Sequence, residues 1–139
     1  MARLTQLTDA DADARAATLF SAIRSKVGMV PNLYRVAANQ PAALAGLLGL
    51  NETLGEGSFD PQLREAIALT VAGVNECDYC ASAHAAISRA LKVAPEDIDA
   101  HLVGRSDKPR TAAILALSVA IVTKKGLVSN EDITAARAV

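Results

Sequence analysis

Both cysteines of the chain lie in one short stretch, Cys77-Asp78-Tyr79-Cys80, and one of its two histidines follows as His84. Two thiols three positions apart can be oxidised to a local disulfide with little movement of the backbone. A histidine four residues after the second thiol lies on the same face of a helix, where it can act as a base toward that thiol. The spacing therefore predicts redox chemistry.

The stretch is predicted to open a helix near Cys77, with both thiols in the first turn. Unpaired N–H groups and the helix dipole favour a thiolate there, and lower the pKa of a thiol from about 8.5. At about 100° per residue, Cys77 and His84 fall within about 60° of Cys80. Ile87 and Leu91 share this wedge. We expect the wedge to face the core, so that the reactive groups point into a partly desolvated pocket.

Glu65 stands directly before a run without charged side chains, residues 66–75. It shares a helical face with Leu69 and Ala72, and a carboxylate on such a face is costly to bury without a partner. His84 is the obvious candidate partner. We therefore expect a Glu–His–Cys relay, in which the imidazole is oriented by Glu65 and moves a proton to and from sulfur.

The surrounding sequence predicts an all-α fold. Alanine dominates, aromatic residues make up only 3% of the chain, and no segment alternates as a strand does. This composition favours closely packed helices over a β-sandwich. At 139 residues the chain is expected to form a single domain spanning residues 1–139. Capping residues and prolines predict helices that begin near the following positions: Asp9 (capped by Thr8, with Asp11 reciprocal), Pro31, Pro41, Pro61 (capped by Asp60), Cys77, Pro95, Ala112 and Asn130 (capped by Ser129 with Asp132).

Net charge and hydropathy limit the partners and the cellular location that we expect for the protein. A net charge of −1 gives no reason to expect nucleic acid or an acidic membrane surface as a partner. The longest strongly apolar run, residues 112–122, is far shorter than the roughly 20 residues of a membrane span. The N-terminus lacks the apolar run of a signal peptide, so we expect a cytoplasmic protein, where a permanent structural disulfide is unusual.

Two predicted helices, covering residues 66–75 and 112–122, are apolar on nearly all sides. Together they carry more apolar surface than a small monomer easily hides, so we expect part of it to form a subunit interface.

The second histidine, His101, lies in a charged segment between Asp99 and Arg105. We expect His101 to be a surface residue.

The arrangement of Glu65, eleven intervening residues, Cys77-x-x-Cys80 and x-x-x-His84 also resembles a family signature. It is similar to that of the AhpD-like alkylhydroperoxidases of the carboxymuconolactone decarboxylase superfamily. The resemblance covers roughly residues 30–125, and it includes the flanking sequences Val30-Pro31-Asn32-Leu33-Tyr34 and Leu63-Arg64-Glu65-Ala66-Ile67-Ala68-Leu69.

The resemblance implies the all-helical AhpD-like fold, assembled as homotrimers or homohexamers, and reduction of hydroperoxides without a metal or organic cofactor. By this likeness Cys80 is the peroxidatic sulfur, which passes through a sulfenic acid, and Cys77 is the more exposed partner that resolves it to a disulfide. His84 and Glu65 complete the proton relay. The implied electron donor is a dithiol protein, such as a lipoyl domain or a thioredoxin-like protein.

Two departures from the family pattern qualify what the resemblance implies. The founding peroxidases have a histidine immediately before the second cysteine, where this chain has Tyr79. A phenol with a pKa of about 10 cannot replace an imidazole as a base near pH 7, so a weaker relay or a different substrate is expected. Many relatives also continue beyond the position of Val139 into another apolar helix. The expectation there is a gap in the core or interface, or a shorter variant.

Other readings of the cysteine pair remain open. Cys77, Cys80 and His84, with Glu65 as a fourth ligand, could hold zinc in a structural or regulatory module, although structural sites usually take their ligands from loops. A non-catalytic oligomer could use the pair to sense redox state. A thioredoxin-like fold is disfavoured because no βαβ pattern surrounds the pair. The decarboxylase branch of the superfamily is disfavoured because it does not depend on a cysteine pair.

Overall fold

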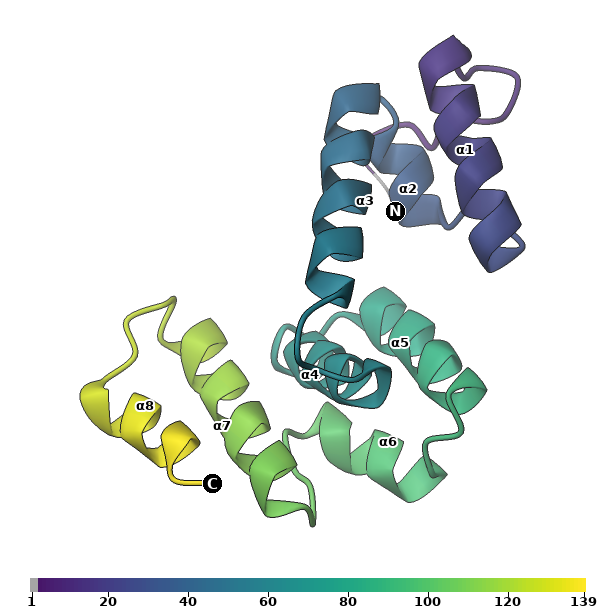
Figure 1. The fold of residues 1–139 in the computed structure, drawn as a ribbon. Helices are drawn as coiled ribbons and strands as arrows, with labels where there is room; N and C mark the ends of the chain where they lie inside the picture. Colours follow the sequence, from purple (N-terminus) through teal and green to yellow (C-terminus); the bar gives the residue numbers. More distant parts are fainter. Residues whose placement is uncertain (1–2) are drawn as a thin grey trace. The chain divides into compact units, whose positions relative to one another are not determined.

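The computed structural model describes residues 3–139, and within that range it contains eight α-helices and no strand (Figure 1). The predicted all-α class is confirmed. Contacts divide the chain into two compact units, the first ending at Gly57 and the second beginning at Ser58. The expectation of a single domain over residues 1–139 stays a prediction.

The first unit contains helices α1 (Ala14–Val27), α2 (Asn32–Ala37) and α3 (Pro41–Gly55). Its core is small, with a single buried aromatic ring from Phe20, and Arg35 lies over this ring at 5.3 Å from its centroid. Helix α1 ends where Gly28 adopts a left-handed φ of 82° and donates its N–H to the carbonyl of Arg24, as the sequence predicts. The buried residues of this core are Ala16, Phe20, Ile23, Val30, Ala38 and Leu44.

The predicted start of the first helix near Asp9 is wrong, because α1 begins at Ala14. Asp13 caps it, and its Oδ1 accepts the N–H of Ala16 at 2.7 Å. Thr8 and Asp11 instead close a separate turn, in which the Thr8 hydroxyl donates to the Asp11 carboxylate at 2.5 Å. A second acidic residue that can cap was present four positions later, and it is this residue that starts the helix.

The second unit is built around helix α4 (Pro61–Val74), which packs against α5 (Asp78–Ala90), α6 (Pro95–Leu102) and α7 (Pro109–Thr123). Figure 1 shows these three helices around α4, with α8 (Asn130–Arg137) beside α7. Asp60 caps α4 by accepting the N–H of Leu63 at 2.9 Å, and Pro61 occupies the first turn. The buried residues of α4 are Leu63, Ala66, Leu69, Thr70 and Ala72, so this helix forms the centre of the unit.

Helices α4 and α6 approach each other so closely that their backbones are in contact. A Cβ atom added at Gly73 would lie 1.9 Å from the carbonyl oxygen of Leu102, so only glycine fits there. One helical turn earlier, the Thr70 hydroxyl donates to the carbonyl of His101 at 2.7 Å. The two contacts fix α6 against α4 at both the backbone and the side-chain level.

Helix α7 is apolar on nearly all sides, but its neighbours bury that apolar surface only in part. Leu115 is its one fully buried residue, whereas Ile121 is 45% exposed. The next helix, α8, has the predicted capping box between Ser129 and Asp132. The expected subunit interface on α7 stays a prediction. Within residues 3–139, none of the helices combines the length and the hydropathy that a bilayer span requires.

Candidate active site

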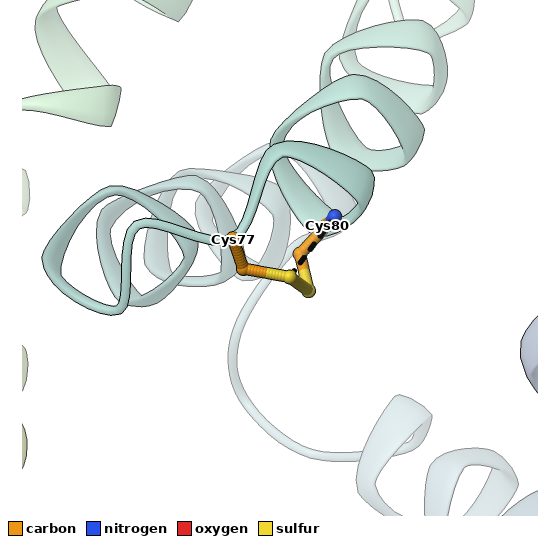
Figure 2. The surroundings of a disulfide bond; sticks show 2 residues. All are labelled: Cys77 and Cys80. Atoms are coloured by element: carbon orange, nitrogen blue, oxygen red, sulfur yellow. Dashed lines mark hydrogen bonds between the residues drawn. A yellow bond between two sulfur atoms is a disulfide. The ribbon is translucent and has the colours of Figure 1, made fainter. Parts of the chain in front are cut away.

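The two cysteines form a disulfide at the start of α5 (Figure 2). Their Cα atoms lie 5.3 Å apart, and neither thiol is free. Cys77 is the N-cap of the helix, and its Sγ accepts the backbone N–H of Cys80 at 3.3 Å, as the dashed line in Figure 2 shows. The predicted position of both residues at the opening of this helix is confirmed. Both are half-buried.

The connection between α4 and α5 places the pair. Helix α4 ends at Val74, and Glu76 adopts a left-handed φ of 51°. This turn lets the N–H of Cys77 donate to the carbonyl of Ala72 at 3.0 Å. Hydrogen bonds of this kind use carbonyl groups that a helix end leaves unpaired, so the end of α4 anchors the first residue of the pair.

Glu65 of α4 and His84 of α5 contact each other directly, with 2.7 Å between Glu65 Oε2 and His84 Nδ1. Because a carboxylate can only accept, Nδ1 of His84 donates in this contact, and Nε2 is left to act on another group. The Glu65 side chain is only 15% exposed, and that of His84 is 34% exposed. The predicted partner of the half-buried carboxylate is therefore in place.

Cys80 and His84 stand four residues apart on α5, on neighbouring turns of one face. The buried residues of this helix are Ala85 and Ser88, whereas Ile87 is 45% exposed. The prediction that Ile87 faces the core is therefore wrong. Helix α5 packs on its neighbours through the small side chains of Ala85 and Ser88, so the reactive wedge lies at the edge of the buried face. All four residues of the candidate site are half-buried.

Tyr79, which replaces the histidine of the founding peroxidases, is 48% exposed.

The zinc reading gains no support from the geometry. Among residues 3–139, no group of three or more histidine, cysteine, aspartate or glutamate side chains is arranged to hold a metal ion. In this structure the two sulfur atoms are bonded to each other, so both cysteines are present as a disulfide and neither is a free thiolate that could bind a metal.

His101 lies elsewhere in the second unit, and the expectation that it is a surface residue is wrong. It is only 8% exposed. Helix α6 docks on α4 through Ile98 and His101, which are three residues apart and therefore on one face. The spacing of Ile98 and His101 was the available signal, and the charged residues around them obscured it.

The family follows from a comparison of sequences. The sequence model of the carboxymuconolactone decarboxylase family matches residues 41–120, which is more than half of the chain and includes all four residues of the candidate site. The chain belongs to the carboxymuconolactone decarboxylase family. No curated protein matches the sequence.

Solved structures agree with this family. A protein described as the alkylhydroperoxidase AhpD core from Rhodospirillum rubrum ATCC 11170 is 31% identical, with a TM-score of 0.68, and the match covers 96% of this chain and 98% of that one. A second AhpD core, a peroxidase-related protein from Ralstonia eutropha JMP134, is 25% identical with a TM-score of 0.84, over 98% of this chain and 74% of that one.

A further peroxidase-related protein, from Silicibacter sp. TM1040, shares the fold with a TM-score of 0.82 at 24% identity, over 99% of this chain and 73% of that one. These likenesses confirm that this member of the carboxymuconolactone decarboxylase family has the AhpD-like helical fold that the sequence predicted.

Proposed function

We propose that this member of the carboxymuconolactone decarboxylase family is a thiol-dependent peroxidase, which reduces hydrogen peroxide or small organic hydroperoxides. The observation that carries the proposal is the Cys77–Cys80 disulfide at the start of α5, one turn before a histidine that is hydrogen-bonded to a glutamate. A peroxidase cycle needs two thiols that can pair and a base beside them. The peroxidase-related names of the neighbouring structures support the same class.

In the first step, the thiolate of Cys80 attacks the terminal oxygen of the hydroperoxide. The S–O bond forms as the O–O bond breaks, and the alcohol, or water from hydrogen peroxide, leaves after taking up a proton. Cys80 is thereby oxidised to a sulfenic acid, and the peroxide is reduced by two electrons. His84 stands one turn away on the same face of α5, which suits it to take the thiol proton and deliver it to the leaving oxygen.

In the second step, the thiolate of Cys77 attacks the sulfur of the Cys80 sulfenic acid. The S–S bond forms, the S–O bond breaks and the hydroxide leaves as water after taking up the proton that the Cys77 thiol gave up, which yields the same disulfide that this structure contains. A dithiol protein of the lipoyl or thioredoxin-like class then reduces the disulfide by thiol–disulfide exchange and takes up the oxidation in its own sulfur pair. Half-burial of both cysteines is compatible with access by such a partner.

The roles of the two sulfurs are tested by intact-mass measurement of reduced, metal-free protein after one equivalent of hydroperoxide. The unmodified chain should lose two hydrogens as the disulfide forms. Cys77→Ser should instead gain one oxygen, which a sulfenic-acid trapping reagent converts to an adduct on Cys80. Cys80→Ser should gain no oxygen on this timescale and should abolish peroxide consumption.

The outcomes separate the competing readings. If Cys80→Ser consumes peroxide normally, the assignment of the attacking sulfur is wrong. If the disulfide forms but no lipoyl or thioredoxin-like donor sustains turnover, the pair is a redox sensor and not part of a peroxidase. Two thiols that stay reduced under peroxide would exclude both, and a native mass with one zinc per chain would favour the metal reading.

A further inference from the structure

The second unit holds a cavity of about 310 Å³ that none of Glu65, Cys77, Cys80 and His84 lines. The cavity lies where three helices begin, because residues from the first turns of α4, α6 and α7 form its wall. Its volume is at the lower end of the range for small-molecule sites in proteins. The wall includes the polar residues Lys92, Asp97, His101, Lys108 and Arg110.

Two of the three helices begin at this cavity without a side-chain cap. The residues before α6 and α7 are Ala94 and Lys108, and neither side chain caps its helix. The α4 start differs, because Asp60 caps it. Helix starts without a cap leave backbone N–H groups unpaired and carry the positive end of the helix dipole, which favours an anion.

The cavity wall also carries three cationic side chains, from Lys92, Lys108 and Arg110. Within residues 3–139, none of the three forms an ion pair, although Arg24, Lys26, Arg35 and Lys124 do so elsewhere. Asp97 and Asp60 are the acidic residues of the wall, and the Asp60 carboxylate is occupied in capping α4. The three cations outnumber the two carboxylates, so the wall carries a net positive charge, and none of its cations is held in an ion pair by the described residues.

His101 supplies an independent observation. Its side chain lines the cavity and is only 8% exposed, and the imidazole makes no hydrogen bond to any group in the described part of the chain. Burial lowers the pKa of His101 below its ordinary value of 6.5; Asp97 opposes this shift and Lys108 adds to it. Among the described residues, Ser88 Oγ alone is a side-chain polar atom that has no partner and is also sealed from solvent. The ring nitrogens of His101 have no partner but are not sealed, so they still meet solvent. A polar ring that lines a cavity, has no protein partner and still meets solvent is free to pair with a ligand there.

We infer that this cavity binds a small molecule through an oxyanion, either a carboxylate or a phosphate group. Lys108 and Arg110 provide charge, the free N–H groups at the starts of α6 and α7 provide donors, and His101 provides a hydrogen bond from its ring. Hydrogen bonds to a charged acceptor are about twice as strong as neutral ones, so a few such contacts suffice for a small ligand.

The test is a titration of ¹⁵N-labelled full-length protein with sulfate, phosphate and succinate, followed by amide chemical shifts at constant ionic strength. The largest shifts should fall within residues 92–97 and 106–111. Lys108→Gln and Arg110→Gln should each weaken binding by about tenfold or more, which corresponds to the loss of one charged hydrogen bond. Arg137→Gln, an exposed cation of the last turn of α8 that does not line the cavity, should leave binding unchanged.

Sulfate stays a dianion between pH 5 and 8, so its affinity reports the protein alone. It should rise as pH falls, because a protonated His101 adds a positive charge that faces Lys92, Lys108, Arg110, Asp97 and Asp60 across the cavity. His101→Gln should remove this pH dependence while leaving the fold intact. A preference for phosphate over succinate, or the reverse, identifies the kind of oxyanion.

Shifts spread over all exposed cations, or binding unchanged in both Lys108→Gln and Arg110→Gln, would overturn the inference. So would the absence of saturable binding by all three anions up to about 10 mM, which is tenfold above a Kd of about 1 mM. The outcome is independent of the proposed peroxidase function, because Cys80→Ser should bind the anions as the unmodified chain does. A peroxidase failure with anion binding intact therefore leaves the cavity assignment standing.

Discussion

The contact between Glu65 and His84 links two helices through one hydrogen bond of 2.7 Å. We predict that Glu65→Gln lowers the rate of peroxide consumption by about 10- to 100-fold, because a neutral amide oxygen accepts from Nδ1 more weakly than a carboxylate and does not stabilise a charged imidazole. Stopped-flow measurement of peroxide loss checks this. Glu56→Gln, in an exposed position just after α3, is the matched control and should leave the rate unchanged.

His84→Ala should slow the same step, and it should do so mainly at neutral pH, where a base is needed to take the thiol proton. At alkaline pH the thiol ionises without help, so the variant should approach the unmodified rate. A pH profile of the rate of disulfide formation measures this recovery. A deficit that is equally large at every pH would show that His84 maintains the shape of the site and does not transfer a proton.

His101 leads to a prediction about stability. Its pKa is lowered in the folded state by burial, so the folded state binds fewer protons than the unfolded state once pH falls below about 6.5. The stabilising contribution is present above that pH and is lost as pH falls through the lowered folded pKa. Urea unfolding in chloride buffer between pH 8 and 5 should show this loss, and His101→Gln should reduce it. The lowered pKa of Asp9 acts only below about pH 4, outside this window.

The contacts within the candidate site could be predicted from the sequence because they depend on short-range spacing. Cys77, Cys80 and His84 lie at or on one helix, and Glu65 contacts the histidine that was expected to be its partner. The catalytic roles of these residues stay a prediction. The environment of His101 could not be predicted in the same way. Its burial depends on how closely α6 approaches α4, which in turn depends on Gly73, 28 residues earlier in the chain. Local pattern carries no information about such a contact.

Among the elements, the close approach of α4 and α6 gives a sharp test. Gly73→Ala should destabilise the fold by about 1–3 kcal/mol, since its Cβ would meet the Leu102 carbonyl oxygen and the helices would have to separate. Gly49→Ala lies within α3, where a new Cβ meets nothing within 4 Å. It should stabilise by up to about 1 kcal/mol through helix propensity. Chemical denaturation of both variants measures the change in the free energy of unfolding. Changes of the same sign in the two variants would contradict the close contact between Gly73 and Leu102.

Helix starts were predictable where the sequence offers a strong N-terminal signal. Asp60 followed by Pro61 predicted the start of α4, and the capping box of Ser129 with Asp132 predicted the start of α8. The start of α1 was not, since Thr8 and Asp13 are both good capping residues and the sequence does not rank them. Asp9 forms ion pairs with Arg24 and Arg35, and these hold the segment before Asp13 outside the helix. The helix therefore starts after Asp13.

At the scale of the whole molecule, the incomplete burial of α7 leads to a prediction about assembly. We expect a homotrimer or homohexamer of the 14.4 kDa chain, with α7 in the interface. Analytical ultracentrifugation checks the mass. Ile121→Asp, which places a charge on the exposed side of α7, should shift the distribution toward the monomer, whereas Lys125→Glu, just beyond the helix, should not. A monomer in the unmodified chain would contradict the prediction.

The disulfide closes a ring over a sequence separation of only 3. A crosslink this short restricts the unfolded chain very little, so its contribution to the free energy of unfolding is small compared with that of a long-range crosslink. Cys77 also lies at a helix cap, where a thiol or a thiolate can accept the same N–H. The oxidised and reduced chains should therefore melt at nearly the same temperature. In the proposed cycle, electrons would be stored and released at this pair without the protein passing through a weakened state.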